Sequence, residues 1–286
     1  MSRLVLLVSM ALGATACASS QSRMHRALDP SMERVLRTQQ YLFSVSGISS
    51  NPSRLARGDG YIYLSDLAPQ MRYLAHTGDT ARYRVLRAFV QEHMLRRDPD
   101  GFVPGRRYRA DASFQPATPY GYLFLNRALS EAWQSLRDTA SAQLVAQIKW
   151  NETPSSASYP TMYKLMTRCA EAMDVVSTDP AAGRAVLKDA KALLHAPKVE
   201  AEQAAEGKTA LEGEADALAC LTRLSIALAD PDATVRNLDH LLDHLNPLLN
   251  HSGRPDMGTT ADILLTLNRV RAAGPRYFDP ANTSKE

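Results

Sequence analysis

The chain has few of the residues and patterns that mark several large classes of protein. It has only three cysteines, with no CxxC pair and no cysteine–histidine cluster, so a zinc-binding module and a dense disulfide scaffold are excluded. The net charge is only +3, and no block of lysine and arginine is long enough to indicate nucleic-acid binding. GxSxG, Walker A and GxGxxG patterns are absent, and the sequence predicts no cofactor.

Long apolar runs are also missing, with one short exception at the N-terminus. Residues 4–13 are mostly apolar and follow Arg3. This run is shorter than the roughly 20 residues that a membrane-spanning helix needs. The small residues Ala14-Thr15-Ala16 come next and are typical of a signal-peptide cleavage site. We therefore predict that residues 1–16 are a signal peptide.

The end of this segment resembles the lipobox of bacterial lipoproteins. Residues 12–17 are Leu-Gly-Ala-Thr-Ala-Cys, and Ala14 stands where that family prefers leucine. The resemblance implies a lipid on Cys17 that anchors the chain in the outer membrane, facing the periplasm or the cell surface. The alternative is a soluble periplasmic or secreted protein, because Ala14 and Ala16 also suit the general signal peptidase. Residues 17–29 are predicted to be a tether.

Apolar residues spaced three and four apart dominate the rest of the chain, and alternating runs are rare. Aspartate followed by proline opens three of these segments, at Asp29-Pro30, Asp179-Pro180 and Asp230-Pro231. Such a pair starts a helix well, because the carboxylate accepts free N–H groups and proline has no N–H to leave unpaired. The class predicted is all-α, built of helical hairpins. Residues 30–277 are predicted to form a single α-helical domain, and residues 278–286 a disordered tail.

Aromatic residues are few, but most of them gather in one stretch. Of the 19 aromatic residues, 12 lie between Asp59 and Trp133. A helix is predicted over residues 65–77, ended by Gly78. Another begins at Thr118-Pro119, and residues 97–117 before it are predicted to be an ordered loop rich in arginine.

The order of motifs in this stretch resembles the six-hairpin glycosidases, the α/α-toroid enzymes, and especially their endoglucanase-like branch. The resemblance covers about 75 residues and rests on four motifs. Ser65-Asp66 opens a helix that ends at Gly78-Asp79, and a second helix contains residues 89–93. The turn at residues 98–104 then leads to Arg106-Arg107-Tyr108, and Ala117-Thr118 opens the next helix. The resemblance implies a full or partial (α/α) toroid that acts on polysaccharide.

The chain departs from this family at the acidic residues. Ser65-Asp66-Leu67 stands where the family has Ser-Glu-Gly, which supplies the general acid, so the carboxylate here is shorter. Pro119 and Gly121 stand in the region where the family has two aspartates. A retained fold with lost or altered chemistry is therefore open.

Three aspartates are the candidate catalytic residues. Inverting glycoside hydrolysis needs an acid and a base about 6.5–9.5 Å apart. Asp66 or Asp59 would be the acid and Asp111 the base, if their segments converge. The structural alternatives are a first-turn helix carboxylate for Asp66, a turn residue for Asp59 and an ion pair with Arg109 for Asp111.

Tyrosine and arginine side chains near the ends of these helices are the candidate substrate-binding residues. Aromatic rings can stack on sugar rings, and a guanidinium fork matches the carboxylate of an acidic sugar. The predicted set is Tyr61, Tyr63, Arg106, Arg107, Tyr108, Arg109, Tyr120 and Tyr122. The alternative for the arginines is a solvated surface loop. The function predicted is binding of an envelope or extracellular polysaccharide, with hydrolysis as an extension. The rival is a non-catalytic helical scaffold that binds an envelope protein.

Two further pairs of residues have competing interpretations. His240 and His244 are four apart, a spacing that suits metal ligands on one helix face, but they fall opposite the leucine stripe, so we predict an exposed polar face and no metal. Cys169 and Cys220 have apolar neighbours at helical spacing and are predicted to be buried thiols. A disulfide is the alternative, because an export compartment permits one.

Overall fold

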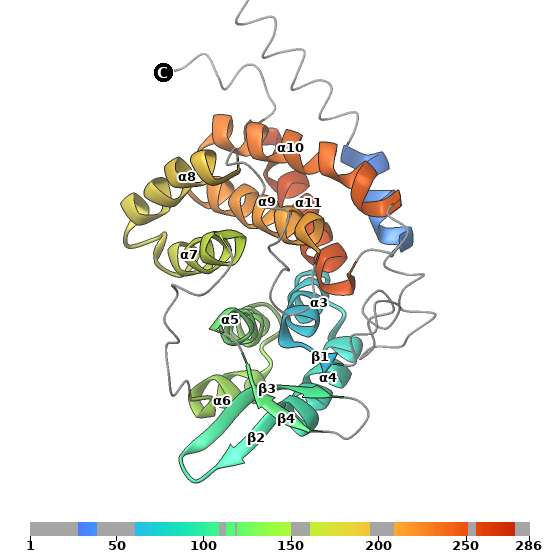
Figure 1. Ribbon diagram of the computed structural model, residues 1–286, viewed down its shortest axis with the longest axis vertical. Coiled ribbons are helices and arrows are strands. Elements are labelled where there is room, and N and C mark those ends of the chain that lie inside the picture. The colour runs from blue at the N-terminus through green and yellow to red at the C-terminus, as the bar shows by residue number, and fades with distance from the viewer. Residues whose placement is uncertain are drawn as a thin grey trace, which may run out of the picture.

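The computed structural model describes residues 28–38, 61–108, 113–117, 119–149, 161–194, 209–250 and 256–277 (Figure 1). Most of these residues are helical, which confirms the predicted all-α class. After a helical segment at residues 28–38, the helices are α3 (Leu64–Thr77), α4 (Thr80–Phe89), the π-helical η1 (Val90–Met94), α5 (Pro119–Leu136), α6 (Thr139–Gln147), α7 (Thr161–Val175), α8 (Pro180–Leu194), α9 (Ala210–Ala227), α10 (Pro231–Asn250) and α11 (Met257–Tyr277). The predicted signal peptide, most of the tether and the C-terminal tail lie outside the described residues.

The helix ends follow the capping residues that the sequence indicates. Gly78 ends α3 in a left-handed conformation with φ 75°, which glycine adopts without steric cost. The Asp79 carboxylate then accepts from the Arg82 N–H at 3.1 Å and caps α4. Asp179 and Asp230 accept in the same way at the starts of α8 and α10. These helix starts are confirmed.

Two prolines lie inside long helices. A proline inside a helix usually kinks or ends it, but α10 continues past Pro247 to Asn250, and Leu245 and Leu248 are buried on either side of it. Similarly, α11 continues past Gly274-Pro275 to Tyr277. Burial of the flanking apolar face in α10 can outweigh one lost hydrogen bond, so the helix survives its proline.

The predicted loop at residues 97–117 is instead mostly a small antiparallel sheet. Its strands are β1 (Tyr61–Ile62), β2 (Leu95–Asp98), β3 (Gly101–Tyr108) and β4 (Phe114–Pro116), and β3 pairs with each of the other three. Only the turn between β2 and β3 was predicted. Gly105 is essential to the pairing, because a Cβ there would lie 2.2 Å from Phe114 Cζ. Proline, glycine and adjacent arginines hide the alternation that normally reveals a strand.

Five helices contact one another in a closed circuit. α3 packs against α5, α5 against α7, α7 against α9, α9 against α11, and α11 returns to α3. α4, α6, α8 and α10 each pack on the helix that precedes them in the chain. In Figure 1, α3 and α5 lie between the group of α7 to α11 and the sheet with α4 and α6. A full or partial toroid stays a prediction.

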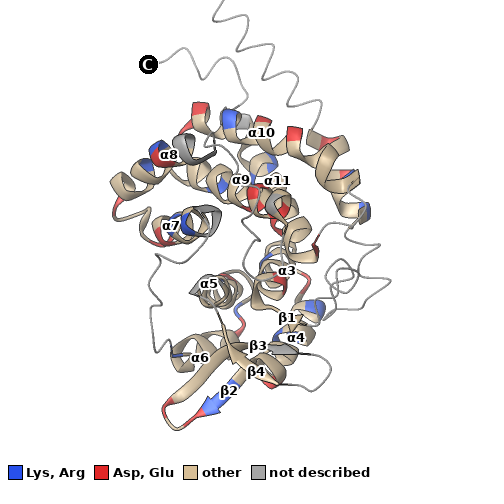
Figure 2. Cartoon of the chain, in the orientation of Figure 1, with Lys and Arg blue, Asp and Glu red and all other residues tan. Residues whose placement is uncertain are grey.

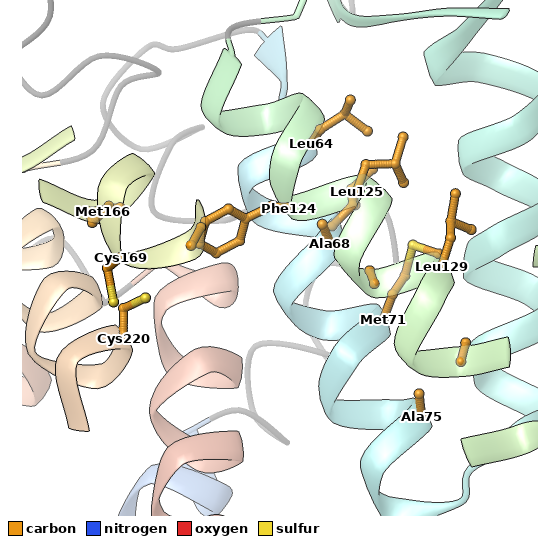
Figure 3. Packing of buried hydrophobic residues seen from close by; sticks show 14 of the residues in the cluster. Leu64, Ala68, Met71, Ala75, Phe124, Leu125, Leu129, Met166, Cys169 and Cys220 are labelled. Carbon is orange, nitrogen blue, oxygen red and sulfur yellow. The ribbon is translucent and has the colours of Figure 1, made fainter. Parts of the chain in front are cut away.

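The buried apolar residues form two clusters that α9 joins. One cluster contains residues of α3 to α8, and Figure 3 shows α3 and α5 packed through Met71, Leu125 and Leu129. The other contains residues 28–38 with α10 and α11. α9 contributes Leu221 to the first cluster and Leu218 to the second. Within the described residues, no helix combines the length and apolar character that a membrane span requires.

A pair of glycine substitutions tests the contact between α11 and α3. A Cβ on Gly258 would lie 2.6 Å from Ser65 O and 2.8 Å from Asp66 Cα, so Gly258→Ala must push two backbones apart. We expect it to lower the free energy of unfolding by about 1–3 kcal/mol. Gly213→Ala in α9 is the control, because its Cβ would meet nothing within 4 Å. Thermal unfolding should show Gly213→Ala unchanged or slightly stabilised. An equal change in stability in the two variants would contradict the close approach of α11 to α3.

Candidate functional site

The antiparallel pairing of β1 with β3 brings together two of the segments that the sequence singles out. Tyr61 lies opposite Tyr108, and Ile62 lies opposite Arg107. β1 leads directly into α3, whose first turn contains Asp66. We call this region the β1–β3 junction: β1, residues 106–108 of β3, and the first turn of α3.

The described tyrosines of this region differ in their surroundings. Tyr61 is half-buried, and its hydroxyl accepts from Gln115 Nε2 of β4 at 3.2 Å. Its ring is 5.9 Å from the ring of Tyr63, tilted by 45°. Tyr63 itself is only 5% exposed, and Tyr122 packs against the first apolar cluster. Tyr61 is therefore better placed than Tyr63 to offer a ring to a ligand.

Several predicted site residues cannot be placed by their side chains. Arg106, Arg107 and Tyr108 belong to β3, and Tyr120 belongs to the first turn of α5, but their side chains are outside what the structure describes. Asp59, Arg109 and Asp111 lie outside the described residues altogether. The described part of the chain therefore contains one of the three candidate acids.

That acid, Asp66, is buried where the starts of two helices meet. It is 3% exposed and lies in the first turn of α3. Its Cα and the Asp256 carboxylate both lie within about 3 Å of the place that a Cβ on Gly258 would take. Asp256 precedes α11, and its carboxylate accepts from the Thr259 N–H at 2.9 Å. Asp256 is not among the predicted site residues, although its spacing to Thr259 is that of a helix cap.

A third helix start joins this group through Glu212. The Glu212 side chain accepts from the Asp256 N–H at 2.9 Å and from the Thr209 N–H at 2.7 Å. Thr209 in turn accepts from the Glu212 N–H, which completes a capping box at the start of α9. The carboxylates of Glu212 and Asp256 satisfy backbone donors that would otherwise be unpaired, so their first role is structural.

A buried ionic network occupies the space between the five helices of the circuit. Arg72 of α3 donates to both carboxylate oxygens of Glu131 on α5, at 2.9 and 3.1 Å, and its other nitrogen is 3.6 Å from Asp262 of α11. Arg223 of α9 donates to the same Asp262 at 2.8 Å. Arg72 and Arg223 are each at most 2% exposed. Arg72 and Asp262 thus connect four helices, namely α3, α5, α9 and α11.

The network continues to α7 through a second arginine of α5. Arg127 donates to Asp174 at 2.7 Å and to the Ala170 carbonyl at 3.2 Å. Arg269 of α11 lies 3.4 Å from Glu131. Four arginines face three carboxylates, namely Glu131, Asp174 and Asp262, so the network carries one excess positive charge. Its members are far apart in the sequence and were not predicted.

The charges around Glu131 change its acidity. Burial alone would raise the pKa of Glu131, but Arg72, Arg269 and Arg127 together hold that pKa at about 2. Burial also lowers the pKa of Arg127 and of Arg269. The carboxylate therefore remains ionised at all but strongly acidic pH.

One of the two histidines of α10 contacts a carboxylate on the neighbouring helix. His244 Nε2 lies 3.1 Å from the Glu214 carboxylate of α9, and its other ring nitrogen lies 3.0 Å from the His240 carbonyl. Among the described residues, no three His, Cys, Asp or Glu side chains gather in a way that would hold a metal ion. His244 instead connects α10 to α9.

Comparisons with protein-family models, with curated proteins and with solved structures give no match. The resemblance to six-hairpin glycosidases and the lipobox resemblance therefore stay predictions.

The Glu131 interactions predict a particular loss of stability in acid. Because the folded-state pKa of about 2 lies below the usual value of 4.5, the unfolded chain binds the proton first. Stability that is complete above about pH 5 should fall as pH drops toward 2, by about 2–3 kcal/mol from this group. Glu131→Gln should be less stable at pH 7 and should flatten this slope in denaturant titrations.

Glu171→Gln is the matched control, because Glu171 is an exposed carboxylate on α7. This variant should keep the slope of the unaltered chain. A Glu131→Gln variant with the same acid slope as the unaltered chain would contradict the proposed ionic role.

Proposed function

We propose that the chain binds a polysaccharide of the cell envelope or extracellular space at the β1–β3 junction. The observation that supports this best is the antiparallel pairing of β1 with β3, which joins Tyr61 and the start of α3 to the strand that contains Arg106, Arg107 and Tyr108. Aromatic and guanidinium groups suit a sugar ring and its acidic substituents.

The sheet around the junction gives Tyr61 a fixed position. Its hydroxyl is held by Gln115 of β4, and Phe114 of the same strand lies 5.2 Å beneath the guanidinium of Arg96 on β2. A ring held in this way loses little freedom when a ligand binds, so more of the contact energy is available for binding. Figure 2 shows both basic and acidic residues on β2 and the turn that follows it, so the case for an acidic polymer rests on Arg106 and Arg107 of β3.

Hydrolysis is the extension of this proposal, with Asp66 or Asp59 as the acid and Asp111 as the base. Asp66 lies in the first turn of α3, which is part of the junction. The rival proposal, a helical scaffold for an envelope protein, needs none of these side chains at the junction.

Exchange of one tyrosine tests the binding proposal. Tyr61→Ala should weaken retention on an acidic polysaccharide about three- to tenfold, because one ring contact is lost. Trp133→Ala is the control, since Trp133 is 39% exposed and lies 14 residues, or about 20 Å, from the start of α5. Affinity electrophoresis against a panel of neutral and acidic polysaccharides measures both variants.

The same panel, assayed for released reducing ends, decides between binding and hydrolysis. Asp66→Asn and Asp111→Asn should each abolish release if both acids act. Release that survives Asp111→Asn would remove Asp111 from the proposal. Retention without release would leave a binding protein, and no retention on any polymer would favour the protein scaffold.

We further propose that the chain is exported and anchored through a lipid on Cys17. Cys17→Ser should release the chain from the outer-membrane fraction into the soluble fraction, and the mature protein should lose the mass of its acyl groups. Cys169→Ala, which leaves the proposed lipid site intact, should stay with the membrane. Membrane association unchanged by Cys17→Ser would contradict the anchor.

A further inference from the structure

Two cysteines from different helices face each other in the core. Cys169 of α7 is 0% exposed and Cys220 of α9 is 2% exposed. Figure 3 shows the two side chains with their sulfur atoms pointing toward one another across the contact between α7 and α9. The Cys169 thiol donates a hydrogen bond to the Cys220 sulfur. In the structure both residues are free thiols.

In the folded chain, the surroundings of the two sulfurs make their thiols differ in acidity. Burial raises the pKa of Cys169. The hydrogen bond from Cys169, together with the nearby Arg223, outweighs burial at Cys220 and lowers the pKa of that thiol to about 7. A thiolate is the nucleophile in disulfide exchange, and a thiol with a pKa near the ambient pH reacts best. In the folded chain, Cys220 therefore has the more acidic thiol, and the Cys169 sulfur lies next to it.

Other uses of the pair fit the surroundings less well. A metal site needs more ligands, and among the described residues no third His, Cys, Asp or Glu completes one. The nearby side chains include Leu165, Met166 and Leu221, which offer no chemistry beyond packing. Packing alone would not require two sulfurs to meet.

We propose that Cys169 and Cys220 form a disulfide that links α7 to α9 when the chain folds in an oxidising compartment. The thiolate of one cysteine attacks a disulfide oxidant, such as oxidised glutathione, and expels one of its thiolates. The other cysteine then loses its proton and attacks the sulfur of the first, which expels the rest of the oxidant as a second thiolate. Two electrons pass to the oxidant, and the protein gives up two protons.

The burial of both sulfurs determines when this exchange takes place. An oxidant reaches them before α7 and α9 have closed over the pair, and the finished core then protects the bond from reductants. The link closes a loop of about 50 residues that contains all of α8. A covalent loop of this length restricts the unfolded chain and so stabilises the folded one.

The test uses the full chain with Cys17→Ser, so that only Cys169 and Cys220 carry thiols. The denatured chain is refolded either in a mixture of oxidised and reduced glutathione or under full reduction. After oxidative refolding we expect no thiol that a thiol reagent detects in denaturant, and a peptide map that links Cys169 to Cys220. Reduction should lower the melting temperature by about 5–10 °C.

Two controls separate the link from loss of packing. Cys169→Ala and the double variant Cys169→Ala/Cys220→Ala should show melting temperatures that do not change with reductant. Two detectable thiols per chain after oxidative refolding to the native circular-dichroism spectrum would overturn the proposal. Dimers linked through single cysteines, in place of the internal bond, would overturn it as well.

Discussion

The guanidinium of Arg72 holds three helices in one arrangement, and the rest of the structure depends on that. It donates two hydrogen bonds to Glu131 of α5 and lies beside Asp262 of α11, which is also bound by Arg223 of α9. Removing these charges from water costs several kcal/mol for each ion, and only a complete set of partners offsets that cost. Five helices must therefore come together in one register or leave a charge unpaired. Apolar packing alone would tolerate small slips between the helices.

The same helix connects this network to the candidate site. Asp66 and Arg72 are six residues apart on α3, which is about 9 Å along the helix axis. The first turn of α3 borders β1 and the start of α11, while its middle is fixed by the ion pairs. The β1–β3 junction is thus attached to a helix that these ion pairs hold in place. A ligand site built on such an element keeps its geometry without a supporting loop.

The helices and the sheet differ in how well the sequence reveals them. Asp79, Asp179 and Asp230 act through neighbours three residues away, so a single sequence is enough to find the caps. β3 pairs with three strands, and residues such as Gly105 matter only because the ring of Phe114 on the paired strand β4 lies against them. The ion pairs were harder still to predict, because Arg72 and Glu131 are 59 residues apart. In the sequence pattern of a helix, a buried arginine that pairs with a distant residue cannot be told apart from an exposed arginine.

The position of Asp66 bears on which activity the fold favours. A carboxylate in the first turn of a helix is stabilised by the N-terminal end of that helix, and here the start of α11 lies next to it as well. A general acid in glycoside hydrolysis has to hold a proton at the working pH, which usually requires apolar surroundings or a second carboxylate nearby. The Asp66 residue is only 3% exposed and is nearly inaccessible to a ligand, whereas the half-buried ring of Tyr61 borders the same helix start. Binding at the β1–β3 junction, with hydrolysis as its extension, is therefore the proposal that we place first.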